Sequence, residues 1–103
     1  METIETYLFN LRNKVFKLLP MREARDKGDE NHLDEYLVNL SSGLAGAFDC
    51  FPSLASEREI VEVQASIAYL KCTPEVSFGE WRSTVLRSAR LISRVLDRCI
   101  KEV

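Results

Sequence analysis

The segment from Val76 to the C-terminus constrains the fold of this chain more than any other. Ser77 and Glu80 have the spacing of a capping box, in which each side chain accepts a hydrogen bond from the other residue's backbone amide. Val76 and Trp81 occupy the positions of a hydrophobic staple. Apolar residues recur at helical spacing through this segment, and no proline or glycine interrupts the run from Glu80 to Val103. The residues of this stripe are Phe78, Trp81, Val85, Ala89, Ile92, Leu96, Cys99, Ile100 and Val103. The pattern predicts a long amphipathic helix whose apolar face the rest of the chain must cover.

The opposite face of this predicted helix carries cations, which we call the basic ridge. Its members are Arg87, Arg90, Arg94, Arg98 and Lys101. Residues 80–103 have a net charge of +3 and residues 1–79 a net charge of −5, so the overall charge of −2 conceals a bipolar surface. One interpretation of the ridge is a solvated face that complements the helix dipole. The other is an anion-binding surface for an acidic protein or a nucleic-acid backbone.

The first helix is predicted over residues 3–19, and Pro20 is expected to end it. Its stripe consists of Ile4, Tyr7, Leu8, Leu11, Val15 and Leu18. The charged segment 21–31 lacks periodicity and is predicted to be the longest loop. Phe9 and Phe16 lie off the stripe, so we expect a second buried side that the loop or another chain covers, the latter giving a homo-oligomer.

Two further helices are predicted between these, one that carries a stripe from Leu33 to Phe48 and ends near Cys50, and one at about residues 57–72. The apolar stripe of the first of these helices consists of Leu33, Tyr36, Leu37, Leu40, Leu44, Ala47 and Phe48. The stripe of the second consists of Ile60, Val63, Ile67 and Leu70. Asp29 or Asn31 is expected to cap the former. A second capping box, Ser56 with Glu59, should open the latter. Gly43 and Gly46 cost helix stability, which suggests close approach of a neighbouring helix or a bend.

Four amphipathic helices with mostly short connections predict an all-α, antiparallel four-helix bundle that forms one domain over residues 1–103. No apolar run is long enough to span a membrane. Cys50, Cys72 and Cys99 stand beside apolar residues, so they are expected to be buried thiols in a reducing compartment. We therefore expect a cytoplasmic protein.

The chemical groups that catalysis or metal binding would need are sparse. His32 is the sole histidine, and the expected bundle separates it and Cys72 from the other two cysteines, so no metal site is predicted. No phosphate-binding loop or nucleophile–base arrangement appears. We expect no cofactor and no enzymatic activity.

Carboxylates gather around the predicted loop and the start of the second helix, forming what we call the acidic surface. Its members are Asp26, Asp29, Glu30, Asp34 and Glu35. Such a cluster can be ordinary solvation, or it can steer a basic partner such as a nuclease that must be masked.

The residues at the starts and ends of the predicted helices resemble those of a known class of proteins. Phe51-Pro52 precedes a predicted helix that ends in Ile67-Ala68-Tyr69-Leu70, and Phe78-Gly79-Glu80-Trp81-Arg82 opens the last helix. Over residues 50–100 this layout resembles small all-helical immunity proteins of bacterial contact-dependent growth-inhibition systems. The resemblance implies a cytoplasmic protein that binds one toxin and neutralises it without catalysis, and it carries over no particular residue. The alternative is a nucleic-acid-associated or assembly subunit that uses the basic ridge.

Overall fold

The computed structural model describes residues 3–29 and 31–101, and this part of the chain is all-helical, with no strand. Its elements are α1 (Ile4–Phe16), α2 (Leu18–Asp26), α3 (Leu33–Cys50), the short 3-10 helix η1 (Pro52–Ser56), α4 (Arg58–Cys72) and α5 (Phe78–Lys101). The all-α prediction is thus confirmed. None of the described helices is both long and apolar enough to cross a membrane.

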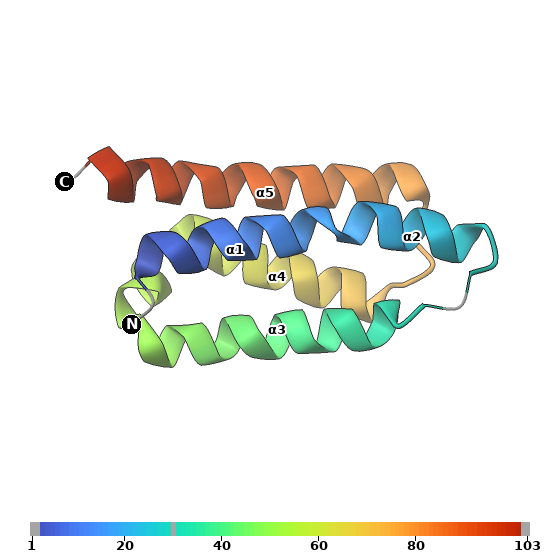
Figure 1. The fold of residues 1–103 in the computed structure, drawn as a ribbon, viewed down its shortest axis with the longest axis horizontal. Helices are drawn as coiled ribbons and strands as arrows, with labels where there is room; N and C mark the ends of the chain where they lie inside the picture. The colour runs from blue at the N-terminus through green and yellow to red at the C-terminus, as the bar shows by residue number, and fades with distance from the viewer. Residues whose placement is uncertain (1–2, 30, 102–103) are drawn as a thin grey trace.

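The helices lie lengthwise in an elongated molecule of about 45 × 22 × 20 Å. In Figure 1, α1 and α2 run in one direction, α3 returns, α4 runs forward again, and α5 spans the molecule on its way back. α5 packs against both α1 and α4, and α3 packs against α4. The longest helix therefore lies against two neighbours, as its continuous apolar face requires.

The buried core confirms the periodic stripes of the sequence. Its buried apolar residues are Leu8, Leu11, Val15, Leu18, Leu33, Leu37, Leu40, Leu44, Ala47, Leu54, Ile60, Val63, Ile67, Leu70, Trp81, Val85, Ala89, Leu91, Ile92, Val95 and Leu96. At about 25 cal/mol per Å² of apolar surface removed from water, this shared core is the main favourable contribution to folding. Ile100 is an exception to the predicted stripe, because 58% of its surface is exposed.

The start of α5 is built partly as the sequence predicts. The backbone amide of Glu80 donates a hydrogen bond of 3.2 Å to the Ser77 hydroxyl. The Glu80 carboxylate, however, accepts a 2.6 Å hydrogen bond from the Tyr69 hydroxyl of α4. Trp81 is fully buried, and Val76 packs against the same core. The capping residue that the sequence assigned to a local bond is therefore used to join two helices.

The prediction that Pro20 ends the first helix and begins a loop is wrong. Pro20 is the third residue of α2, within the first turn, where a backbone N–H would have no partner inside the helix. Pro20 cannot donate a hydrogen bond to the carbonyl of Phe16, four residues earlier, and its ring crowds that carbonyl. The first helix α1 therefore ends at Phe16. The helix then restarts at Leu18, with the Met21 amide bonded to the Lys17 carbonyl at 3.2 Å.

Two arginines of α2 hold the connection between α4 and α5. Arg22 is 7% exposed, and its side chain donates to the Asp26 carboxylate at 3.0 Å and to the Val76 carbonyl at 2.6 Å. Its guanidinium also lies 5.1 Å from the centre of the Trp81 ring. Arg25 donates to the Pro74 carbonyl at 2.9 Å. Most of the segment predicted as a loop is thus a helix that fixes the start of α5.

The predicted caps of α3 and α4 are also wrong. His32 precedes α3 without a capping side-chain bond, while the Asn31 amide donates to the Met21 carbonyl at 2.8 Å. Ser56 belongs to η1, so Glu57 precedes α4, again without a side-chain cap. The Asn31 side chain is used in a contact with α2, and Ser56 is part of the preceding 3-10 helix, so neither caps the helix that the local pattern predicted.

Candidate binding surfaces

The acidic surface lies together at the end of the molecule where α2 leads into α3. Asp26 ends α2 and pairs with Arg22 at 3.0 Å, and Glu30 lies outside the described residues. The remaining three, Asp29, Asp34 and Glu35, are exposed, and we call them the outer carboxylates. Asp34 pairs with Arg25 at 3.4 Å, and Glu35 lies 3.6 Å from the His32 ring. Part of the acidic charge is therefore matched by cations of the same chain.

The basic ridge is divided between internal ion pairs and solvent. Arg87 pairs with Glu62 of α4 at 3.3 Å. Arg98 pairs with both Glu57 and Glu59, and these bonds lower the pKa of the Glu59 carboxyl and raise the pKa of the Arg98 guanidinium. Half of the described ridge thus ties α5 to α4.

The other two described ridge residues, Arg90 and Arg94, face solvent, and we call them the outer arginines. Neither forms an ion pair with another described residue, although Arg94 lies near enough to Glu59 to help lower the pKa of that carboxyl. The side chain of Lys101 lies outside the described part.

Phe9 and Phe16 are 49% and 42% exposed, so the expected cover by the following loop is wrong. The Arg12 guanidinium lies 5.4 Å from the centre of the Phe9 ring and donates to the Ser93 hydroxyl of α5 at 2.9 Å. The Phe9 ring therefore borders the seam between α1 and α5. The use of Phe9 and Phe16 by another copy of the chain stays a prediction.

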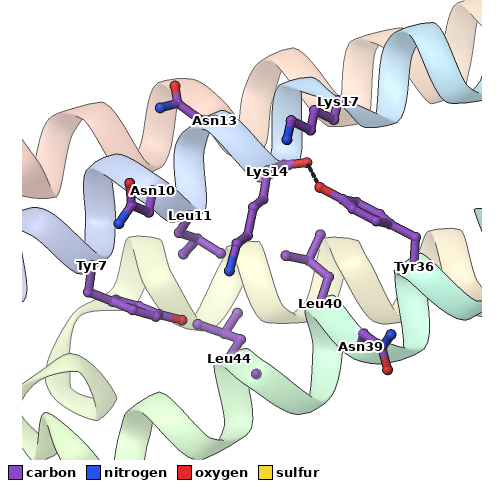
Figure 2. A pocket seen from close by; sticks show the side chains of 11 residues that line it. Tyr7, Asn10, Leu11, Asn13, Lys14, Lys17, Tyr36, Asn39, Leu40 and Leu44 are labelled. Carbon is purple, nitrogen blue, oxygen red and sulfur yellow. Dashed lines mark hydrogen bonds between the residues drawn. The ribbon is translucent and has the colours of Figure 1, made fainter.

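A groove of about 590 Å³ lies between α1 and α3. α1 packs mainly on α5 and α3 on α4, which leaves the facing sides of α1 and α3 apart. From α1 the groove is lined by Tyr7, Asn10, Leu11, Asn13 and Lys14, with Lys17 just beyond that helix, and from α3 by Tyr36, Asn39, Leu40, Gly43 and Leu44. Figure 2 shows the Lys14 side chain extending from α1 into the gap toward α3, beside Leu40 and above Leu44.

Tyrosines mark the two ends of this groove. The Tyr36 hydroxyl donates a 2.7 Å hydrogen bond to the Lys14 carbonyl and so bridges the two helices, as Figure 2 shows. Partial burial raises the pKa of this Tyr36 hydroxyl. At the other end, the Tyr7 ring contacts the Phe51 ring with centroids 5.7 Å apart. The groove is thus a bounded space with an apolar floor and a polar rim.

The groove was not predicted from the sequence, although Gly43, one of its lining residues, stood out in the second predicted helix. Gly43 was interpreted as a point of close helix approach, but a Cβ added there, or at Gly46, would meet nothing within 4 Å. That interpretation is wrong, since Gly43 borders open space. Asn10, Lys14 and Lys17 follow Tyr7 at helical spacing beside the core stripe, but they are polar, so they resemble a solvated face.

The cysteines are more accessible than predicted. Cys50 and Cys72 are exposed and Cys99 is half-buried, so the expectation of buried thiols at the first two is wrong. Each of the exposed pair is the last residue of its helix and does not belong to the buried residues of that helix. No group of three or more His, Cys, Asp or Glu among the described residues could hold a metal ion.

Comparisons with protein families, with curated proteins and with solved structures each found no match.

Proposed function

We propose that this chain is an antiparallel four-helix bundle that acts as a non-catalytic protein-binding module. Counting α1 and α2 as one segment, four helical segments alternate in direction along the long axis (Figure 1), which supports the bundle. The observation that carries the binding function is the groove between α1 and α3, a preformed concave surface with an apolar floor.

The composition of the groove suits a protein ligand. Tyr7 and Tyr36 offer rigid, amphipathic contact area, and aromatic residues of this kind are enriched in protein interfaces. Asn10, Asn13 and Asn39 provide both donors and acceptors, so they can adapt to a polypeptide backbone. The groove is open to solvent along its side, which allows a segment of a folded partner to enter.

We propose further that the partner is a toxin domain which this protein binds and neutralises in the cytoplasm. The helix layout that resembles immunity proteins supports this class, and the acidic surface would steer a basic toxin during encounter. Within this proposal the groove provides the contact, and the outer carboxylates influence mainly the association rate.

The second candidate is a nucleic-acid-associated subunit, and one observation favours it. The outer arginines are solvent-exposed and form no ion pair with a described residue, so they are available to phosphate. The other described ridge arginines are held by carboxylates of α4. Because an extended backbone contact needs more cations than this pair, we place this function second.

Two glycine variants test the proposed function. Gly43→Arg places a long side chain in the groove, whereas Gly46→Arg makes the same change in the same helix outside its lining. Both glycines are helical and exposed, so both changes should leave folding intact or improve it by about 1 kcal/mol. Each variant is co-expressed with the product of the adjacent open reading frame, and complex formation and rescue of growth are measured.

We expect the wild type and Gly46→Arg to bind and protect, and Gly43→Arg to do neither. Equal binding by all three would refute the groove as the contact surface. Salt-sensitive binding to duplex DNA that disappears when the outer arginines are replaced by glutamine would favour the second candidate instead.

A further inference from the structure

We infer that the groove between α1 and α3 receives a short acidic segment of the partner, with a carboxylate beside Lys14 and apolar side chains against the Tyr7 and Tyr36 rings. This inference rests on the proposed function and specifies the chemistry of the segment that binds. The partner as a whole can still be basic elsewhere, since only the segment inside the groove is constrained.

The first argument is charge. The eleven lining residues include Lys14 and Lys17 and no carboxylate. Neither lysine forms an ion pair within the described residues, in contrast to Arg25, Arg87 and Arg98. Lys14 also extends over the gap rather than away from it (Figure 2). A carboxylate from a partner would therefore find an ammonium group with no competing anion in the lining.

The second argument is the apolar surface of the lining. Leu11, Leu40 and Leu44 close the floor of the groove, but they are 3%, 6% and 0% exposed, so a ligand gains little by covering them. The half-buried rings of Tyr7 and Tyr36 also line the groove and keep apolar surface open to a ligand. A segment made only of charged residues would leave these rings uncovered, which favours leucine-like or aromatic side chains next to the carboxylate.

The third argument is length. Tyr7 and Lys14 are separated by two helical turns, or about 10 Å at a rise of 1.5 Å per residue. The Tyr36 bridge closes one end of this stretch and the Tyr7–Phe51 contact borders the other. The space suits one or two turns of a helix, with the carboxylate and the apolar anchor three or four residues apart. Gly43 leaves the α3 wall open for entry.

The test uses a library of short random peptides displayed on phage and selected on immobilised wild-type protein. The same library is selected on Lys14→Glu, Gly43→Arg and Gly46→Arg, after circular dichroism and unfolding curves show that each variant folds. Asn39→Trp enters the groove from an exposed rim position and adds bulk without charge, so it serves as the blocking variant for acidic peptides.

We expect wild type and Gly46→Arg to enrich acidic peptides with at least one apolar or aromatic residue. Selected peptides should lose affinity by about tenfold or more on Asn39→Trp, which fills the groove without adding a cation. Lys14→Glu should reverse the preference toward basic peptides, because like charges at close range are strongly unfavourable. Enrichment of neutral or basic peptides by the wild type, or an unchanged preference with Lys14→Glu, would overturn the inference.

The peptide selection and the co-expression test can refute their two hypotheses independently. If the adjacent gene product binds the wild type but not Gly43→Arg, the groove is a protein-binding site even when the selected peptides are not acidic. If acidic peptides bind the groove but the gene product does not, the chemistry of the groove stands and the toxin-neutralising function falls.

Discussion

Trp81 joins three parts of the molecule, and its replacement by alanine should be among the most damaging single changes. The side chain is fully buried, and its indole N–H donates to the Leu18 carbonyl of α2 at 3.0 Å. The guanidinium of Arg22 stacks over its ring. Trp81→Ala therefore removes core volume at the start of α5 and the contacts that hold α2 there.

The magnitude can be worked out from these contacts. Truncating a buried tryptophan to alanine costs about 3–5 kcal/mol. Loss of the indole hydrogen bond contributes about 1 kcal/mol, and loss of the stacked cation a similar amount. The truncation cost already includes part of these two losses, so we expect a total loss of about 4–6 kcal/mol in the free energy of unfolding. A chain of this length has a total stability of about 5–15 kcal/mol, and the variant should therefore be close to unfolding.

Urea unfolding followed by far-UV circular dichroism measures this change without relying on tryptophan fluorescence. Trp81→Phe keeps an aromatic ring but loses the N–H, so it should cost about 1–2 kcal/mol. Arg90→Ala on the exposed face of α5 is the control and should stay within about 0.5 kcal/mol. A loss below about 2 kcal/mol for Trp81→Ala, with an unchanged dependence on urea, would refute the assignment of this residue as the link between α2 and α5.

The thiols, one ion pair and the charged surfaces each allow a further test. In the native protein Cys50 and Cys72 should react rapidly with a thiol reagent and Cys99 more slowly; protection of the first two would contradict their exposure. Because Arg98 lowers the folded pKa of Glu59, this carboxylate contributes stability above its unfolded pKa and loses it as the pH falls through the folded value. The stability difference between wild type and Glu59→Gln should accordingly shrink on acidification below the ordinary glutamate range, and a difference that persists in acid would exclude the pair as its source. Charge reversal of the outer carboxylates should slow association with a basic partner, more so at low salt, whereas reversal of the outer arginines should not. The opposite ranking would favour nucleic acid.

The helical stripes could be predicted from the sequence because burial imposes a period on the residues themselves. Ile60, Val63, Ile67 and Leu70 are all buried, as their spacing requires. This signal needs no knowledge of the partner helix, since any neighbour that excludes water satisfies it. The all-helical fold results from the same regularity.

Local polar signals were less reliable, because a polar side chain has several partners to choose from. Glu80 has the correct position for a capping box, yet its carboxylate bonds to Tyr69, eleven residues earlier. Arg22 belongs to a charged segment without periodicity, yet it is buried against Trp81 and the Val76 carbonyl. These choices depend on which helices become neighbours, and no local pattern encodes that.

The same reasoning explains why counting charges along the chain overestimated two surfaces and missed a third. Arg98 and Glu59 stand on different helices, so the sequence shows a cation and an anion where the fold makes one pair. Lys14 presents the reverse case. It is an ordinary lysine in a mixed helix, but the groove places it opposite tyrosine, asparagine and leucine rather than a carboxylate. The charge available to a partner is therefore the charge that remains after ion pairs have formed between neighbouring helices. In the groove this charge is the Lys14 ammonium, which has no carboxylate among the lining residues and lies beside tyrosine and leucine side chains.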